Sequence, residues 1–82
     1  MAKFRKKPAV IDAWLYRQGE QDADLAYAVI DGRLRYAEDG TALIATREGA
    51  MEVKPGDYII RGVQGDLYPM PPDIFAATYE AA

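Results

Sequence analysis

Three side chains that are close in the sequence, Tyr58, Arg61 and Tyr68, are of types that together could bind a ligand. A guanidinium binds phosphate or carboxylate through parallel hydrogen bonds. Tyrosine rings beside exposed glycine backbone, here Gly62 and Gly65, are typical of a pocket for a nucleotide base or a peptide. These three side chains are therefore our candidate ligand-binding residues. The same pattern is also that of a cross-strand aromatic pair that stabilises a hairpin.

The position of Arg61 favours a structural role over a ligand contact. It follows directly after a run of strand-forming apolar residues, where an unpaired charge would be costly to bury. Acidic residues crowd the same segment, so we expect Arg61 to pair with Asp57, Asp66 or Asp73. Replacing Arg61 by alanine would then leave a carboxylate without its partner and lower the stability of the fold.

A second group of cations lies at the start of the chain. Residues 3–7 hold four of the ten basic residues, and all thirteen acidic residues follow them. Such an arm can bind phosphate or pair with the acidic body of a neighbouring subunit, although a solvated edge is the favoured interpretation. We retain Lys6 and Lys7 as candidate ligand-binding residues. The net charge of −3 argues against a duplex-DNA reader, so nucleic acid is the weaker option.

The residue types that are missing argue against an enzyme. The chain has no cysteine and no histidine, which removes the thiolate nucleophile, the commonest general base and the commonest metal ligands. Asp57 and Asp73 stand where turns and helix caps favour aspartate, so we interpret them and Asp66 as structural. We therefore expect no catalytic residue, no metal and no cofactor.

Length and turn spacing predict the architecture. A chain of 82 residues, half of them apolar, is expected to form a single domain over residues 1–82. Its turn signals recur about every 8–12 residues, which is typical of an antiparallel meander or a small barrel. We predict an α+β, β-dominated fold: a small antiparallel sheet or partly open barrel of about five to six strands, with at most one short helix.

Apolar and β-branched runs between the turns predict the strands. We expect strands over residues 4–16, 34–36, 41–46, 51–53 and 58–60, another after the hairpin at residues 62–65, and a last one over residues 76–80. The first strand is apolar on both faces and is expected to be covered on both. Its Trp14 is interpreted as a core or interface anchor in preference to a surface on which a ligand stacks.

Two short helical segments are less distinct in the sequence. Asp22 is expected to cap a short helix that gives way to a strand near Tyr27, ending at the Asp31-Gly32 turn. Asp73, after two prolines, is expected to cap a single helical turn over residues 74–76.

The two ends of the chain carry specific motifs. The first is Lys3-Phe4-Arg5-Lys6-Lys7-Pro8, with Ala13 after it, and the second runs from Thr46 to Glu80 through Lys54-Pro55-Gly56-Asp57-Tyr58-Ile59-Ile60-Arg61. They resemble a group of small, mostly uncharacterised bacteriophage proteins with a KFRKKP…A start and a VKPGDYIIRGVxGDxYPxxPDIFxxTYE end. Residues 17–40 do not carry the resemblance. Asp66 stands where that group commonly has Glu, and Met70-Pro71 where it has Cys-Lys, which removes one cation.

The resemblance implies a phage protein acting in the host cytoplasm. Together with Arg61 and the two tyrosines, it predicts a non-catalytic accessory protein that binds a small anionic ligand, and in its sharpest form a counter-defence factor that sequesters a host nucleotide signal. This version requires a homo-oligomer, because small folds bury ligands best between subunits. The alternative is a protein–protein interaction module that acts on a host protein or within the phage particle through an exposed strand edge.

A membrane protein is not expected. No apolar stretch approaches the ~20 residues that cross a bilayer. Asp12 and Arg17 also interrupt the apolar run that would have to form the core of a signal peptide.

Overall fold

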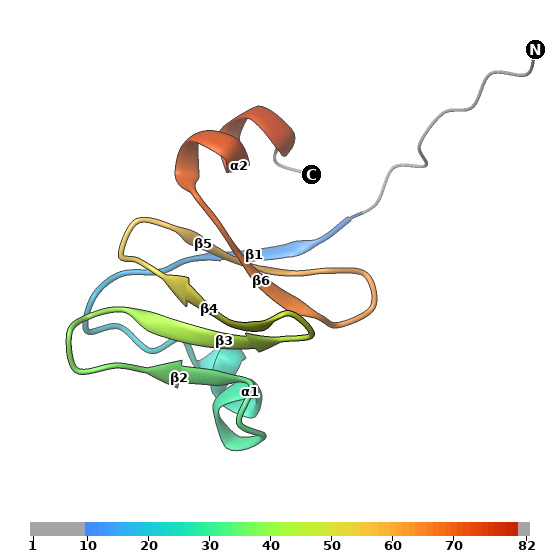
Figure 1. The fold of residues 1–82 in the computed structure, drawn as a ribbon. Helices are drawn as coiled ribbons and strands as arrows, with labels where there is room; N and C mark the ends of the chain where they lie inside the picture. The colour runs from blue at the N-terminus through green and yellow to red at the C-terminus, as the bar shows by residue number, and fades with distance from the viewer. Residues whose placement is uncertain (1–9, 81–82) are drawn as a thin grey trace, which may run out of the picture.

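Two three-stranded antiparallel sheets make up the computed structural model, which describes residues 10–80 (Figure 1). One sheet has the order β1-β5-β6, with β1 (Asp12–Leu15), β5 (Tyr58–Arg61) and β6 (Leu67–Met70). The other has the order β2-β3-β4, with β2 (Leu34–Tyr36), β3 (Ala42–Thr46) and β4 (Gly49–Val53). A 3-10 turn (Ala23–Leu25) leads into α1 (Ala26–Ile30), and α2 (Pro72–Thr78) follows β6. These elements confirm the predicted β-dominated fold, with one α-helix more than expected.

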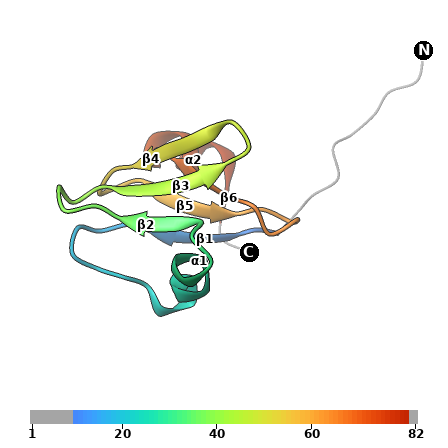
Figure 2. The same cartoon turned by 60° about the horizontal axis from the view of Figure 1, so that its bottom comes forward.

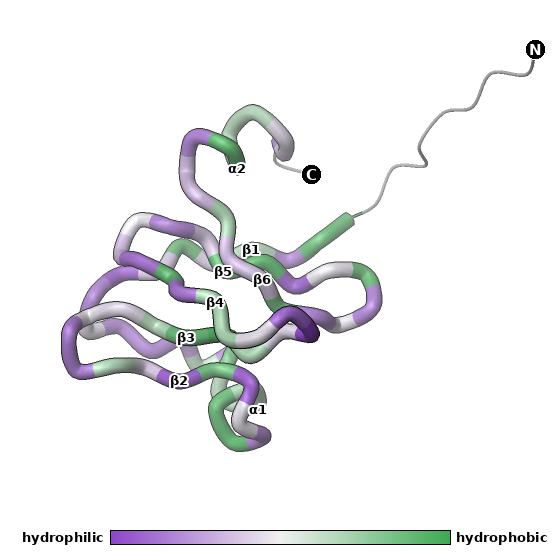
Figure 3. The backbone as a smooth tube through the Cα atoms, viewed as in Figure 1, coloured by the Kyte–Doolittle hydropathy of each residue, from purple (hydrophilic) through white to green (hydrophobic). Residues whose placement is uncertain are grey.

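Glycine-containing turns connect most of the strands, as the sequence predicted. At the turn before β5, Gly56 has a φ of +98°, a conformation that side chains with a Cβ rarely adopt. The Asp57 carboxylate accepts a hydrogen bond of 3.1 Å from the backbone N–H of Lys54 and closes the same turn. The turn between β3 and β4 is among the most hydrophilic parts of the chain (Figure 3).

The hydrophobic core lies between the two sheets, where β3 and β4 pack against β6. Residues alternate along β3, so that Ala42 and Ile44 are fully buried while Leu43, between them, points to the other face. The 3-10 turn and α1, which lies beside β2 (Figure 2), add two more buried residues. The core residues are Tyr16, Leu25, Ala28, Leu34, Ala42, Ile44, Val53, Ile59 and Leu67.

Helix α1 occupies the segment where a strand was predicted to begin near Tyr27, and that prediction is wrong. The predicted cap is present, because the Asp22 carboxylate accepts a 2.9 Å hydrogen bond from the backbone N–H of Asp24. Leu25 and Ala28 are three positions apart and both enter the core, so helical spacing buries them together. Packing of this face overrides the strand propensity of the residues that follow.

Helix α2 replaces the strand predicted over residues 76–80, and this prediction is also wrong. The helix begins at Pro72, and its N-cap is Pro71, not Asp73 as expected. Phe75 of the helix contacts Tyr58 of β5, and Tyr79, the residue after the helix, contacts Tyr68 of β6 through its hydroxyl. The Phe75 ring stacks on Tyr58 with 3.9 Å between centroids. This aromatic contact favours the helix over the local β propensity.

The first strand is shorter and more exposed than predicted. Residues 4–9 of its expected range lie outside the described residues, and β1 is an edge strand. It is not covered on both faces, because only Trp14 is half-buried while Leu15 is 41% exposed. Within residues 10–80, no helix is long and apolar enough to cross a membrane.

Candidate arginine cleft

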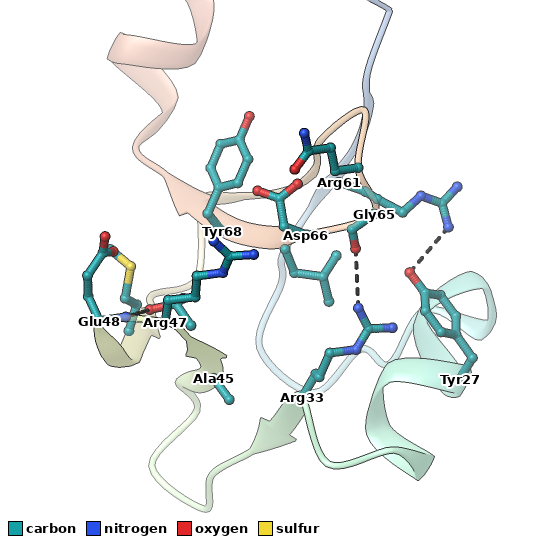
Figure 4. A pocket seen from close by; sticks show the side chains of 13 residues that line it. Tyr27, Arg33, Ala45, Arg47, Glu48, Arg61, Gly65, Asp66 and Tyr68 are labelled. Atoms are coloured by element: carbon teal, nitrogen blue, oxygen red, sulfur yellow. Dashed lines mark hydrogen bonds between the residues drawn. The ribbon is translucent and has the colours of Figure 1, made fainter.

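A cleft of about 1050 Å³ lies beside the β3–β4 turn and the β5–β6 hairpin (Figure 4). Three arginines line it from separate elements: Arg33 just before β2, Arg47 in the β3–β4 turn and Arg61 at the end of β5. Two tyrosines, Tyr27 of α1 and Tyr68 of β6, also line it. We call this site the arginine cleft.

Arg61 is held by an ion pair with Asp12. Its Nη2 and Nε atoms donate hydrogen bonds of 2.6 and 3.1 Å to Oδ2 of Asp12, which the β1–β5 register places directly opposite. Its Nη1 donates to the Tyr27 hydroxyl at 3.3 Å, and its Cζ lies 5.1 Å from the centroid of the Trp14 ring. Hydrogen bonding to Tyr27 and Asp12 raises the pKa of the Arg61 guanidinium above its ordinary value.

Arg61 is therefore paired, as expected, but with a different carboxylate. The expected carboxylates, Asp57, Asp66 and Asp73, do not form the salt bridge. The reason is topological: β1 lies beside β5, so a residue 49 positions away in the sequence faces Arg61 across the sheet.

Arg33 connects the β2 end of the cleft to its β5–β6 end. Its Nε forms a 2.9 Å salt bridge with Asp31, and its Nη1 donates to the backbone carbonyl of Gly65 at 3.2 Å. Its Cζ also lies 5.3 Å from the Tyr27 ring centroid, while that of Arg61 lies 5.9 Å from the same ring. Tyr27 thus contacts both guanidinium groups and fixes their relative position.

Arg47 differs from the other two arginines. It lies in an exposed turn and forms no hydrogen bond or salt bridge with any other residue in the range 10–80. Two carboxylates, Glu48 and Asp66, also line the cleft, so its side chains carry one more positive than negative charge. The guanidinium of Arg47 is accordingly the lining cation best able to take up a new anionic partner.

The predicted ligand residues are only partly brought together. The β5–β6 register pairs Tyr58 with Met70 and Tyr68 with Ile60, on the sheet face opposite Arg61. Tyr58 stacks under α2 and does not line the cleft, whereas Tyr68 does line it. Lys6 and Lys7 lie outside the described residues.

Tyr68 is tied to α2 through its hydroxyl. The hydroxyl oxygens of Tyr68 and Tyr79 lie 3.4 Å apart and share a hydrogen bond. The pKa of Tyr68 is raised to about 12, mainly because the phenol is buried and secondly because of this hydrogen bond. At neutral pH Tyr68 is therefore an uncharged phenol, with its hydroxyl directed to Tyr79 on the sheet face opposite Arg61.

Sequence reasoning missed Arg33, Arg47 and Tyr27. Each lies in or next to a turn or short helix, and no two of them are neighbours in the sequence. One feature of the sequence could have indicated the two arginines. Arg33 follows the turn before β2 and Arg47 lies in the turn between β3 and β4, and side chains at turns are usually exposed.

The arrangement is suited to binding an anion beside aromatic rings. In the part of the chain that the structure describes, no three His, Cys, Asp or Glu side chains form a group that could hold a metal ion. Compared with protein-family models, with curated proteins and with solved structures, the chain matches none of them.

Proposed function

We propose that this protein is a non-catalytic phage accessory protein that binds a small anionic ligand in the arginine cleft. The observation that carries the proposal is that three guanidinium groups line one cleft and that Arg47 is not paired with residues 10–80. Arg33 and Arg61 are each already paired with an aspartate, so they form a preorganised wall beside Arg47 that need not be reorganised when a ligand binds.

A nucleotide is the ligand class that these side chains suit best. Guanidinium groups bind phosphate oxygens in a planar, two-bond geometry, and tyrosine rings stack on bases. The volume of about 1050 Å³ is slightly larger than that of typical ligand pockets, which measure about 300–1000 Å³. Glu48 and Asp66 would accept hydrogen bonds from ribose hydroxyls or a base amino group, which a bare inorganic anion lacks.

In its sharper form, the proposal is that the protein sequesters a host nucleotide defence signal in the host cytoplasm. The cleft is open on a single chain, and a second copy over it would remove the ligand from water. A homo-oligomer is therefore part of the proposal, and sizing of the purified protein tests that part.

The alternative is a protein–protein interaction module that acts on a host protein or within the phage particle. The observation in its favour is the exposed apolar surface of α1, where Ile30 is 87% and Val29 41% exposed. Recovery of a defined partner through wild-type protein, and its loss with an Ile30→Glu variant, would support this alternative.

Native mass spectrometry of the full chain tests the ligand. The probes are adenosine mono-, di- and triphosphate, ADP-ribose and cyclic dinucleotides, with adenosine as the uncharged control. We expect at least one phosphorylated probe to be retained and adenosine not to be. Retention of none of them by a protein that is also strictly monomeric would contradict the proposal.

A further inference from the structure

A second hollow of the surface is built from residues that the arginine cleft does not use. Two adjoining cavities of about 290 and 210 Å³ lie between the segment after β1 and the strand β2. Both are lined by Tyr16, Glu20, Gln21 and Tyr36, so they form one continuous groove. We call it the acidic groove.

Aromatic rings form the floor of the acidic groove. Tyr16 and Tyr36 stack with 6.1 Å between their ring centroids, and the half-buried Trp14 lies at one end. The Tyr16 hydroxyl is satisfied, because it donates a 2.8 Å hydrogen bond to the backbone carbonyl of Gly40. Tyr16 is only 6% exposed, so the ring surface that the groove offers to apolar groups and cations comes from the half-buried Tyr36 and Trp14.

Carboxylates dominate the rim. Glu20, Asp22 and Glu38 line the groove, against a single basic lining residue, Arg17. Neither Glu20 nor Glu38 forms a salt bridge with the residues that the structure describes. An occupant matched to this surface carries several positive charges and an aromatic or aliphatic side chain that can lie on the floor.

We propose that the acidic groove binds the chain's own basic segment, residues 3–7. This segment, Lys3-Phe4-Arg5-Lys6-Lys7, supplies four cations for the carboxylate rim and one ring, Phe4, for the aromatic floor. In this arrangement Lys6 and Lys7 pair with protein carboxylates, and ligand contacts are left to the arginines of the other site.

The connection to β1 favours the segment of the same molecule over that of a second copy. Only residues 8–11 separate the segment from β1, and an extended linker of that length spans about 13 Å. The segment joins β1 at Asp12, and Trp14 and Leu15, two and three positions further along, line the near end of the groove. A short tether gives an effective concentration in the millimolar range, which exceeds the micromolar concentration of other copies.

Paramagnetic relaxation in the full chain tests this placement. The protein has no cysteine, so an Ala2→Cys variant takes a single nitroxide label next to the segment without changing its charge. We expect the label to broaden the amide signals of Gln21 and Glu38 in the groove. The amide of Glu52, on the outer face of the β2-β3-β4 sheet, should keep its intensity.

Charge variants provide the matched control. The pair Glu20→Gln and Glu38→Gln removes two rim charges and leaves the Asp22 cap intact, so the broadening should be lost. The pair Glu52→Gln and Glu80→Gln removes the same two charges outside the groove, so the broadening should remain. Salt at about 1 M, where the Debye length is about 3 Å, should also weaken the broadening in the parent.

Three results would overturn the inference. The first is that the nitroxide label leaves the amide signals of Gln21 and Glu38 as sharp as that of Glu52. The second is an equal loss of broadening in both pairs of charge variants. The third comes from a mixed sample of two chains, one isotope-labelled without nitroxide and the other carrying the nitroxide without isotope label. Broadening of the isotope-labelled chain's groove signals there would mean that the segment occupies the groove of a second copy.

Discussion

Arg61 at the end of β5 donates two hydrogen bonds to a single carboxylate oxygen of Asp12 at the start of β1. The same guanidinium lies over Trp14 and donates to the Tyr27 hydroxyl. One side chain therefore joins an edge strand, its neighbour and α1 at the rim of the arginine cleft. Because Asp12, Trp14 and Tyr27 hold it, Arg61 is a fixed part of the wall and not a free cation.

Arg61→Ala should lower the melting temperature more than Asp12→Asn does. The aspartate change removes one exposed ion pair, which contributes little, whereas the arginine change also removes the contacts to Trp14 and Tyr27. Arg35→Ala, on an exposed strand position outside the cleft, is the control and should melt like the parent. An Arg61→Ala protein as stable as its parent would mean that this arginine is not structural.

Ile44→Ala should destabilise the fold by about 2–5 kcal/mol, because it opens a cavity at a fully buried position. Ile30→Ala is the matched control: the same side chain is removed from a site that is 87% exposed, and the change should stay within about 0.5 kcal/mol. Urea denaturation of both variants measures the two free energies of unfolding. Equal losses would contradict the assignment of the core to the space between the sheets.

The turns and central strands were predictable from the sequence because their signals are local. Gly56 after a proline predicts the turn before β5, and the alternation along β3 predicts its buried face. A helical turn over residues 74–76 was predicted from local signals, but the whole of helix α2 was not, because residues 76–80 were expected to form a strand. The helix is stabilised by the contact of Phe75 with Tyr58, which is not a local feature.

The arginine cleft was predicted in part for a related reason. Arg61 was recognised because its charge interrupts an apolar run, but its partner Asp12 lies 49 positions away. Arg33 and Arg47 reach the same cleft from opposite ends of two strands, and only the sheet order brings them together. Tyr58 was predicted beside Arg61 because the two are close in sequence, whereas strand geometry sends them to opposite faces.

Stability should fall as the pH rises from about 10 to about 12, because Tyr68 resists ionisation in the folded protein. Its pKa is raised to about 12 from an ordinary value of 10.0, so the folded state holds the proton more tightly than the unfolded chain. The resulting stabilisation is complete below the unfolded pKa and is lost as the pH passes the folded one.

Tyr79→Phe removes the hydrogen bond and should lower the pKa of Tyr68 without restoring the ordinary value, since burial remains the larger cause. Phenolate absorbance against pH measures this in the folded protein. An unchanged titration of Tyr68 in the Tyr79→Phe variant would contradict the account of α2 resting on β6.

The most direct test of anion binding at the arginine cleft is calorimetric titration of the retained nucleotide into Arg47→Gln and Arg35→Gln. Both variants lose one exposed arginine, but only Arg47 lines the cleft. A hydrogen bond to a charged group is worth about 1.5–3 kcal/mol. Arg47→Gln should therefore bind about tenfold to a hundredfold more weakly at an unchanged melting temperature. Arg35→Gln should bind like the parent. Equal affinities of the two variants would contradict the assignment of the ligand to this cleft.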